Sequence, residues 1–83
     1  MSKAINGHKY RHYKKATMVY TVVESNALDC ESVEPVVVYR SEYETPDHPE
    51  GTLWVRDRDD FESKVTLPDG CVVDRFTEIF LPL

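Results

Sequence analysis

Glycine is scarce in this chain of 83 residues, and the three that occur, Gly7, Gly51 and Gly70, stand far apart. A phosphate-binding loop needs several glycines close together, and a serine nucleophile turn needs the pattern G-x-S-x-G. Neither pattern is present, so the sequence carries no known catalytic signature of these kinds.

Cysteine and histidine are also few, and their spacing fits no metal site. Cys30 and Cys71 are 41 positions apart without a C-x-x-C pair, so we expect two free thiols, the alternatives being a disulfide or a nucleophilic cysteine. His8 and His12 are four positions apart, which on a strand separates them by roughly 13 Å. We expect these two and His48 to be solvent-exposed, and we predict no metal and no cofactor.

Long apolar runs are absent. The longest, Val36 to Tyr39, is far shorter than the roughly 20 residues that cross a bilayer. The first nine residues lack the apolar stretch of a secretory signal. We therefore expect a cytoplasmic protein with no membrane partner.

Acidic residues are missing from the first 23 positions, which contain five Lys or Arg, whereas the other 60 contain five bases and fifteen acids. The net charge of −5 disfavours nucleic acid as the main partner, although a local basic strand can still hold a phosphate or carboxylate. The alternative is that the basic strand pairs with acidic neighbours in the fold.

What the sequence does contain is a series of short β-type segments. Residues 1–8 show no periodicity and are predicted to be a flexible lead, followed by a single domain over residues 9–83. Ser25 to Ser32 is predicted to be a loop, and Asp57 to Phe61 one helical turn with a buried Phe61. Strands are predicted at Lys9–Tyr13, Thr17–Glu24, Val36–Tyr43, Thr52–Arg56, Val65–Leu67, Val72–Phe76 and, at an edge, Ile79–Leu83.

No stretch of 10 to 12 residues keeps apolar residues at helical spacing, which disfavours helix-rich and parallel α/β folds. Five or six short strands besides the edge segment predict, at this length, an all-β fold in the form of a small barrel with one short helical turn.

Alternation along one strand suggests a binding surface. If Leu53 and Val55 face the core, Trp54 and Arg56 lie together outside; the equally weighted alternative makes Trp54 a core residue past which Arg56 reaches solvent. In either case Arg11, Arg40 and Arg56, which come from three different predicted strands, could converge at one rim. The candidate ligand-binding residues are Arg11, His12, Tyr13, Tyr39, Arg40, Trp54 and Arg56.

Several blocks of the sequence resemble a known family. In order they are Tyr10-Arg11-His12-Tyr13-Lys14, Glu34-Pro35-Val36-Val37-Val38-Tyr39-Arg40, Leu53-Trp54-Val55-Arg56, Phe61 and Arg75-Phe76. Together they resemble the small bacterial family catalogued as domain of unknown function 1653. The resemblance implies an SH3-like barrel or roll and no activity. Its polar positions carry over to Arg11, His12, Tyr13, Lys14, Glu34, Tyr39, Arg40, Trp54, Arg56 and Arg75.

The chain departs from the family pattern at three turns. It has Lys15-Ala16 where the family usually has glycine, and Asp57 and Asp74 where the family often has proline.

Three functions follow as hypotheses. The first is a binding module for an anionic small molecule, peptide or short nucleic acid. The second is a structural or partner-binding domain that adds a strand edge to another chain. The third is a small enzyme using His12 or Tyr13 as acid or base. Too few acids are positioned for catalysis, so we favour a binding module that is not an enzyme.

Overall fold

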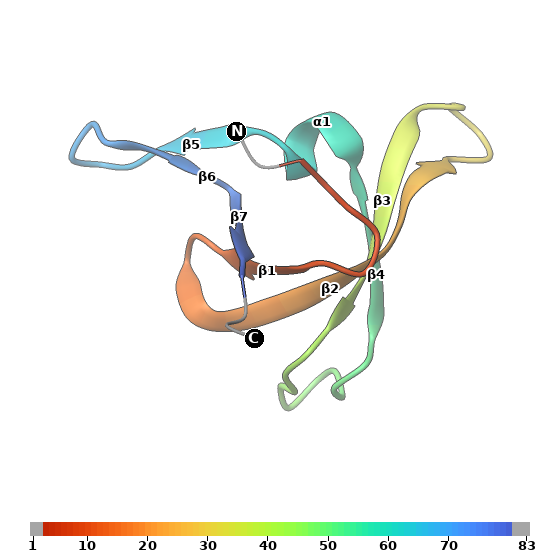
Figure 1. Cartoon of the computed structure of the whole chain (residues 1–83), viewed down its shortest axis with the longest axis horizontal. Coiled ribbons are helices and arrows are strands. Elements are labelled where there is room, and N and C mark those ends of the chain that lie inside the picture. Colours follow the sequence, from red (N-terminus) through yellow and green to blue (C-terminus); the bar gives the residue numbers. More distant parts are fainter. Residues whose placement is uncertain (1–2, 81–83) are drawn as a thin grey trace.

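A computed structural model describes residues 3–80 and contains seven strands and one helical turn (Figure 1). The elements are β1 (Lys9–His12), β2 (Lys15–Leu28), β3 (Pro35–Ser41), β4 (Leu53–Asp57), α1 (Arg58–Phe61), β5 (Lys64–Thr66), β6 (Val72–Asp74) and β7 (Phe76–Ile79). The predicted all-β class with one short helical turn is confirmed.

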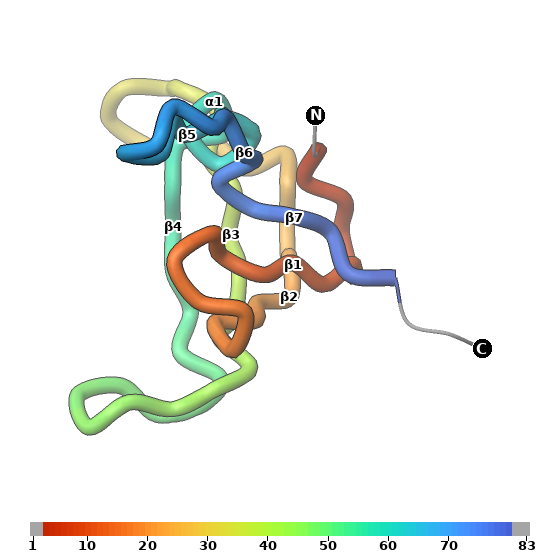
Figure 2. Tube along the Cα trace, turned by 90° about the vertical axis from the view of Figure 1, so that its left-hand side faces the viewer, coloured from red at the N-terminus to blue at the C-terminus, as the bar shows by residue number. Residues whose placement is uncertain are grey.

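Five of the strands form one antiparallel sheet in the order β4-β3-β2-β1-β7, and β5 and β6 form a separate hairpin. The long strand β2 pairs with β1 near its start and with β3 further along, and the register of its pairing with β3 is irregular between Val22 and Ala27. Figure 2 shows the resulting roll from the side. Within residues 3–80 β4 and β7 do not pair, so the sheet is not a closed barrel.

Several predicted boundaries differ from the structure, and two of the differences bear on the fold. The predicted loop from Ser25 begins four residues later, because Ser25 N–H donates to Asn6 Oδ1 and Ala27 pairs with Val36. The predicted strand from Val72 to Phe76 is broken before Phe76, where the chain passes from the hairpin into the main sheet. Of the predicted edge strand at residues 79–83, the last three positions lie outside the described residues.

The core is mainly aromatic. Tyr10, Phe61 and Phe76 are fully buried, and Tyr20 and Tyr39 are nearly so. Phe61 stacks on Phe76 with ring centroids 4.1 Å apart and planes within 6°, while the tyrosine rings pack edge-on around this pair. The four-residue helix α1 has no side-chain cap, and its Phe61 is buried, as predicted.

Residues 3–8 lie against the sheet through specific contacts. Ala4 is buried, and its N–H donates to Glu62 Oε2 at 2.9 Å. Ile5 N–H donates to Tyr10 Oη at 2.9 Å, and Gly7 N–H to the Val22 carbonyl at 2.8 Å. Gly7 has φ of 82°, a conformation that glycine adopts without steric cost.

The fold predicts a steep stability cost at Phe61. Phe61→Ala should lower the free energy of unfolding by about 3–5 kcal/mol, because a fully buried ring is lost from a small core. Leu53→Ala is the control, since Leu53 is 61% exposed and should change stability by about 0.5 kcal/mol or less. Urea unfolding followed by circular dichroism measures both, and equal losses would contradict this account of the core.

Candidate functional site

A cavity of about 240 Å³ opens on the core-facing side of β3 and β4. Five rings contribute to its wall: Tyr20, Tyr39, Tyr43, His48 and Trp54. The remaining lining residues are Ser41, Thr45 and Arg56, so Arg56 supplies the only formal positive charge in the wall. We call this the aromatic pocket.

The pairing of β3 with β4 determines which side chains reach the aromatic pocket. Tyr39 lies opposite Trp54 in the ladder, so both point to the same face, and Arg56 follows two positions after Trp54. Leu53 and Val55 are 61% and 63% exposed on the other face. The interpretation with Trp54 and Arg56 outside is therefore wrong, and the alternative that placed Trp54 against the core is correct.

The tyrosines of the aromatic pocket contact one another through a hydrogen bond and through ring packing. The Tyr20 and Tyr43 hydroxyl oxygens are 2.6 Å apart in a mutual hydrogen bond, and the Tyr20 ring packs edge-on against Tyr39 at 5.0 Å. Burial, followed by the hydrogen bond with Tyr43, raises the pKa of Tyr20 far above its ordinary value. Tyr20 is consequently neutral at physiological pH and adds no charge to the wall of the aromatic pocket.

Arg56 is held at one end of the aromatic pocket by several contacts. Its Nε donates to Tyr39 Oη at 3.3 Å and its Nη1 to Asp60 Oδ2 at 2.6 Å, and its guanidinium carbon lies 5.4 Å from the centre of the Phe76 ring. Arg75 Nε also approaches Asp60, at 3.6 Å. Two arginines, Arg56 and Arg75, thus share the carboxylate of Asp60.

Two buried polar atoms in the wall have no partner within residues 3–80. They are Ser41 Oγ and Trp54 Nε1. An indole N–H can only donate, and a buried donor left unpaired costs about 1–3 kcal/mol. Native structures contain few such groups. Their presence in the same cavity wall is consistent with a site that receives an acceptor group from a ligand.

His12 is buried at 6% exposure, contrary to the predicted solvent exposure of all three histidines. Its ring packs edge-on against Phe76 at 5.0 Å, and its Nδ1 accepts the Lys14 N–H at 3.2 Å. Burial, then the charges of Arg56, Lys14 and Arg75, lowers the pKa of His12 to about 4. The ring is therefore neutral at physiological pH.

The candidate residues divide into two groups and one outlier. Tyr39, Trp54 and Arg56 line the aromatic pocket. Arg11, His12 and Tyr13 border a second cavity, of about 210 Å³, between β1 and the β5–β6 hairpin. Arg40 lines neither, because it is exposed on the outer face and bonded to Glu42. Arg11, Arg40 and Arg56 therefore do not converge at one rim.

Several lining residues were missed from sequence. Ser41 shares a face with Tyr39 by simple alternation, and Tyr20 lies opposite Ser41 in the ladder, so the face of β3 could have indicated both. Tyr43 and His48 come from the segment between β3 and β4, whose path no periodicity reveals.

Cys30 and Cys71 are exposed free thiols, as expected. Within residues 3–80, His, Cys, Asp and Glu side chains form no group of three that could hold a metal ion. In the same part of the chain, no helix has the length and apolar content that a membrane span requires.

Comparison with protein families identifies one model, described as a protein of unknown function (DUF1653), that matches residues 8–78. The resemblance carried by the sequence motifs is thereby confirmed. No curated protein and no solved structure matches the chain.

The buried His12 predicts a specific pH dependence of stability. Its folded pKa of about 4 lies below the ordinary value of 6.5, so between these values only the unfolded chain takes up the proton. Stability should fall by roughly 3 kcal/mol as the pH drops from 6.5 to 4, and this contribution should level off below pH 4.

Nuclear magnetic resonance of the His12 ring and urea unfolding between pH 7 and 4 test this dependence. A His12→Gln variant, which cannot take up a proton there, should lack this part of the pH dependence. A ring that titrates near 6.5 would contradict the burial of His12.

Proposed function

Because the chain belongs to the DUF1653 family of proteins of unknown function, the site itself must indicate the role, and we propose a binding module that holds a small anionic ligand. The observation that carries this proposal is the aromatic pocket, in which Arg56 and two unpartnered buried polar groups stand among five rings. The proposal rests on the hydrogen-bonding capacity and the charge of these groups.

The polar groups of the aromatic pocket favour a ligand that accepts hydrogen bonds. Trp54 Nε1 can only donate, the Ser41 hydroxyl can donate, and Arg56 has only donors. Arg56 Nη2 forms no hydrogen bond among the described residues. Among residues 3–80, none with a carboxylate lines the cavity. A carboxylate or similar oxyanion, attached to an apolar or planar group that contacts the rings, therefore matches the wall.

Charge and size narrow the ligand further. Asp60 already neutralises part of the Arg56 charge, so a monoanion is favoured over a doubly charged phosphate. The volume of about 240 Å³ lies below the roughly 300–1,000 Å³ of sites for drug-sized ligands. Among the ligand classes first considered, a small molecule or one acidic side chain of a peptide is favoured over nucleic acid, in keeping with the net charge of −5.

An enzymatic role has less support. A general base works best with a pKa near the operating pH, whereas the pKa of His12 is lowered to about 4. Nδ1 of His12 is also engaged by the Lys14 N–H. His12 is therefore better explained as a structural residue of the core than as an acid or base.

Trp54 provides a direct test, because it is the only tryptophan of the chain and lies in the proposed site. Benzoate should change its fluorescence saturably, and the matched cation benzylamine should not. Arg56→Gln should weaken benzoate binding by about tenfold or more, the worth of a charge-assisted hydrogen bond.

Arg58→Gln is the matched control, since it removes the same charge from α1 outside the aromatic pocket. Amide chemical shifts of Tyr39, Ser41 and Trp54 should move with benzoate in the parent protein and in the Arg58→Gln variant. Equal binding of benzylamine, equal loss in both variants, or no binding of benzoate would refute the proposal.

A further inference from the structure

The strand β4 has a free edge. Within residues 3–80 it pairs with β3 on one side and with no strand on the other. Ser41 N–H donates to the Thr52 carbonyl, and main-chain groups alternate along an antiparallel strand. Trp54 and Arg56 therefore direct their main-chain groups to β3, whereas those of Leu53 and Val55 point away from the sheet.

The side chains beside this edge are apolar and exposed. Leu53 and Val55 are 61% and 63% exposed, and Val38 lies next to Val55 in the ladder on the same outer face. Natural proteins commonly protect such edges with lysine, proline or a covering segment. Residues 53–57 contain neither lysine nor proline, so the edge is open to pairing with another strand.

Acidic groups lie at both ends of the free edge. Beyond its end a cavity of about 410 Å³ is lined by Glu34, Pro35, Asp57, Asp59 and Asp60. Of these acids only Asp60 forms an ion pair within the described residues. Before β4, the segment that links it to β3 carries three more acids without an ion pair there, Glu44, Asp47 and Glu50.

Figure 2 shows the arrangement of these parts around β4. The strand lies on the outer side of β3, with α1 near one end and the β3–β4 loop at the other. A segment that lies along β4 would therefore meet acidic groups at each of its ends.

We propose that the free edge of β4 binds an extended basic segment of a partner protein, which adds as a strand and places a Lys or Arg side chain in the acidic cavity. In strand addition, main-chain hydrogen bonds supply affinity and alternate side chains supply specificity. Apolar side chains of the added strand would cover Leu53 and Val55. This inference uses the outer face and does not depend on the aromatic pocket.

Charge is the reason to favour a basic partner over a second copy of the chain. Two copies joined antiparallel through β4 would bring the acidic cavity of one beside the acidic β3–β4 loop of the other, and juxtaposed like charges oppose association. A partner with basic residues at both ends of an apolar stretch meets attraction at each end.

Two synthetic peptides with blocked ends test the proposal: Lys-Thr-Val-Thr-Val-Thr-Lys and the same peptide with glutamate in place of both lysines. The lysine peptide should slow hydrogen exchange of the Leu53 and Val55 amides. It should bind at least about tenfold more tightly than the glutamate peptide and weaken as salt is raised.

Val55→Pro removes one donor from the free edge without removing a hydrogen bond to β3, a position at which edge strands tolerate proline. It should weaken the lysine peptide by about tenfold, while the circular dichroism spectrum and the urea unfolding transition stay close to those of the parent protein. These two readouts check the fold without relying on the proposal for the aromatic pocket.

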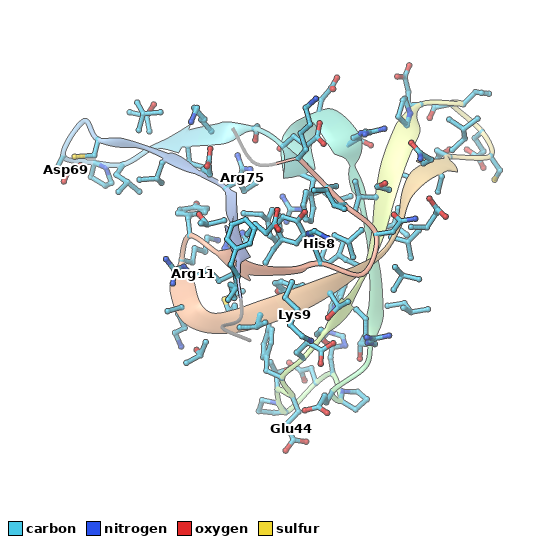
Figure 3. All side chains as sticks on the ribbon, in the orientation of Figure 1. His8, Lys9, Arg11, Glu44, Asp69 and Arg75 are labelled. Carbon is cyan, nitrogen blue, oxygen red and sulfur yellow. The ribbon has the colours of Figure 1, made fainter. Side chains whose placement is uncertain are left out.

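A milder pair of variants keeps the test valid if the proline variant fails to fold. Asp59→Asn removes one charge from the acidic cavity and should weaken the lysine peptide about threefold. Asp69→Asn removes one charge from the distant β5–β6 turn (Figure 3) and should leave binding unchanged.

Four results would overturn the proposal: no slowed exchange at Leu53 and Val55 with millimolar lysine peptide, equal binding of both peptides, shifts confined to the aromatic pocket, or equal effects of the two asparagine variants. Sedimentation of the free protein as a dimer that Val55→Pro dissociates would assign the edge to a second copy and would also overturn it.

Discussion

The stacking of Phe61 on Phe76 is the contact on which the architecture depends. In the order of the main sheet, β4 and β7 are the two outermost strands. Phe61 lies at the end of α1, which directly follows β4, yet the centre of its ring is 4.1 Å from that of Phe76 at the start of β7. Side-chain packing thus draws the two ends of an open sheet together where a barrel would use hydrogen bonds. Tyr10 and Tyr39 pack edge-on against Phe61 and extend this contact into a continuous core.

The same closure concentrates charge at one end of the molecule. Arg56 lies over the Phe76 ring, and Asp60, one residue before Phe61, binds both Arg56 and Arg75. A protonated His12 here would face these arginines in a poorly hydrated space, which explains why its pKa is lowered. The arginine of the aromatic pocket therefore has a fixed position, and a binding site gains affinity when its groups are ordered before the ligand arrives.

The sequence revealed the elements better than it revealed their orientation. Runs of β-branched and aromatic residues located the strands, and acids before Phe61 located the helical turn. The orientation of β4 could not be read from its own residues, because Leu53 and Val55 on one face and Trp54 on the other all suit a core. The pairing of Trp54 with Tyr39 determines which face of β4 points to the core, and this pairing is known only from the folded structure. The burial of His12 likewise depends on Phe76, which is 64 positions away in the chain.

The β5–β6 hairpin is attached differently from every other strand. It belongs to a sheet of its own, and its two ends meet where Arg75 donates from its backbone N–H to the Ser63 carbonyl and from Nε to Ser63 Oγ, both at 3.0 Å. Because that junction closes the base, residues between Lys64 and Asp74 can be lengthened, shortened or exchanged without moving Phe61 or Phe76. We expect this hairpin to tolerate an inserted reporter.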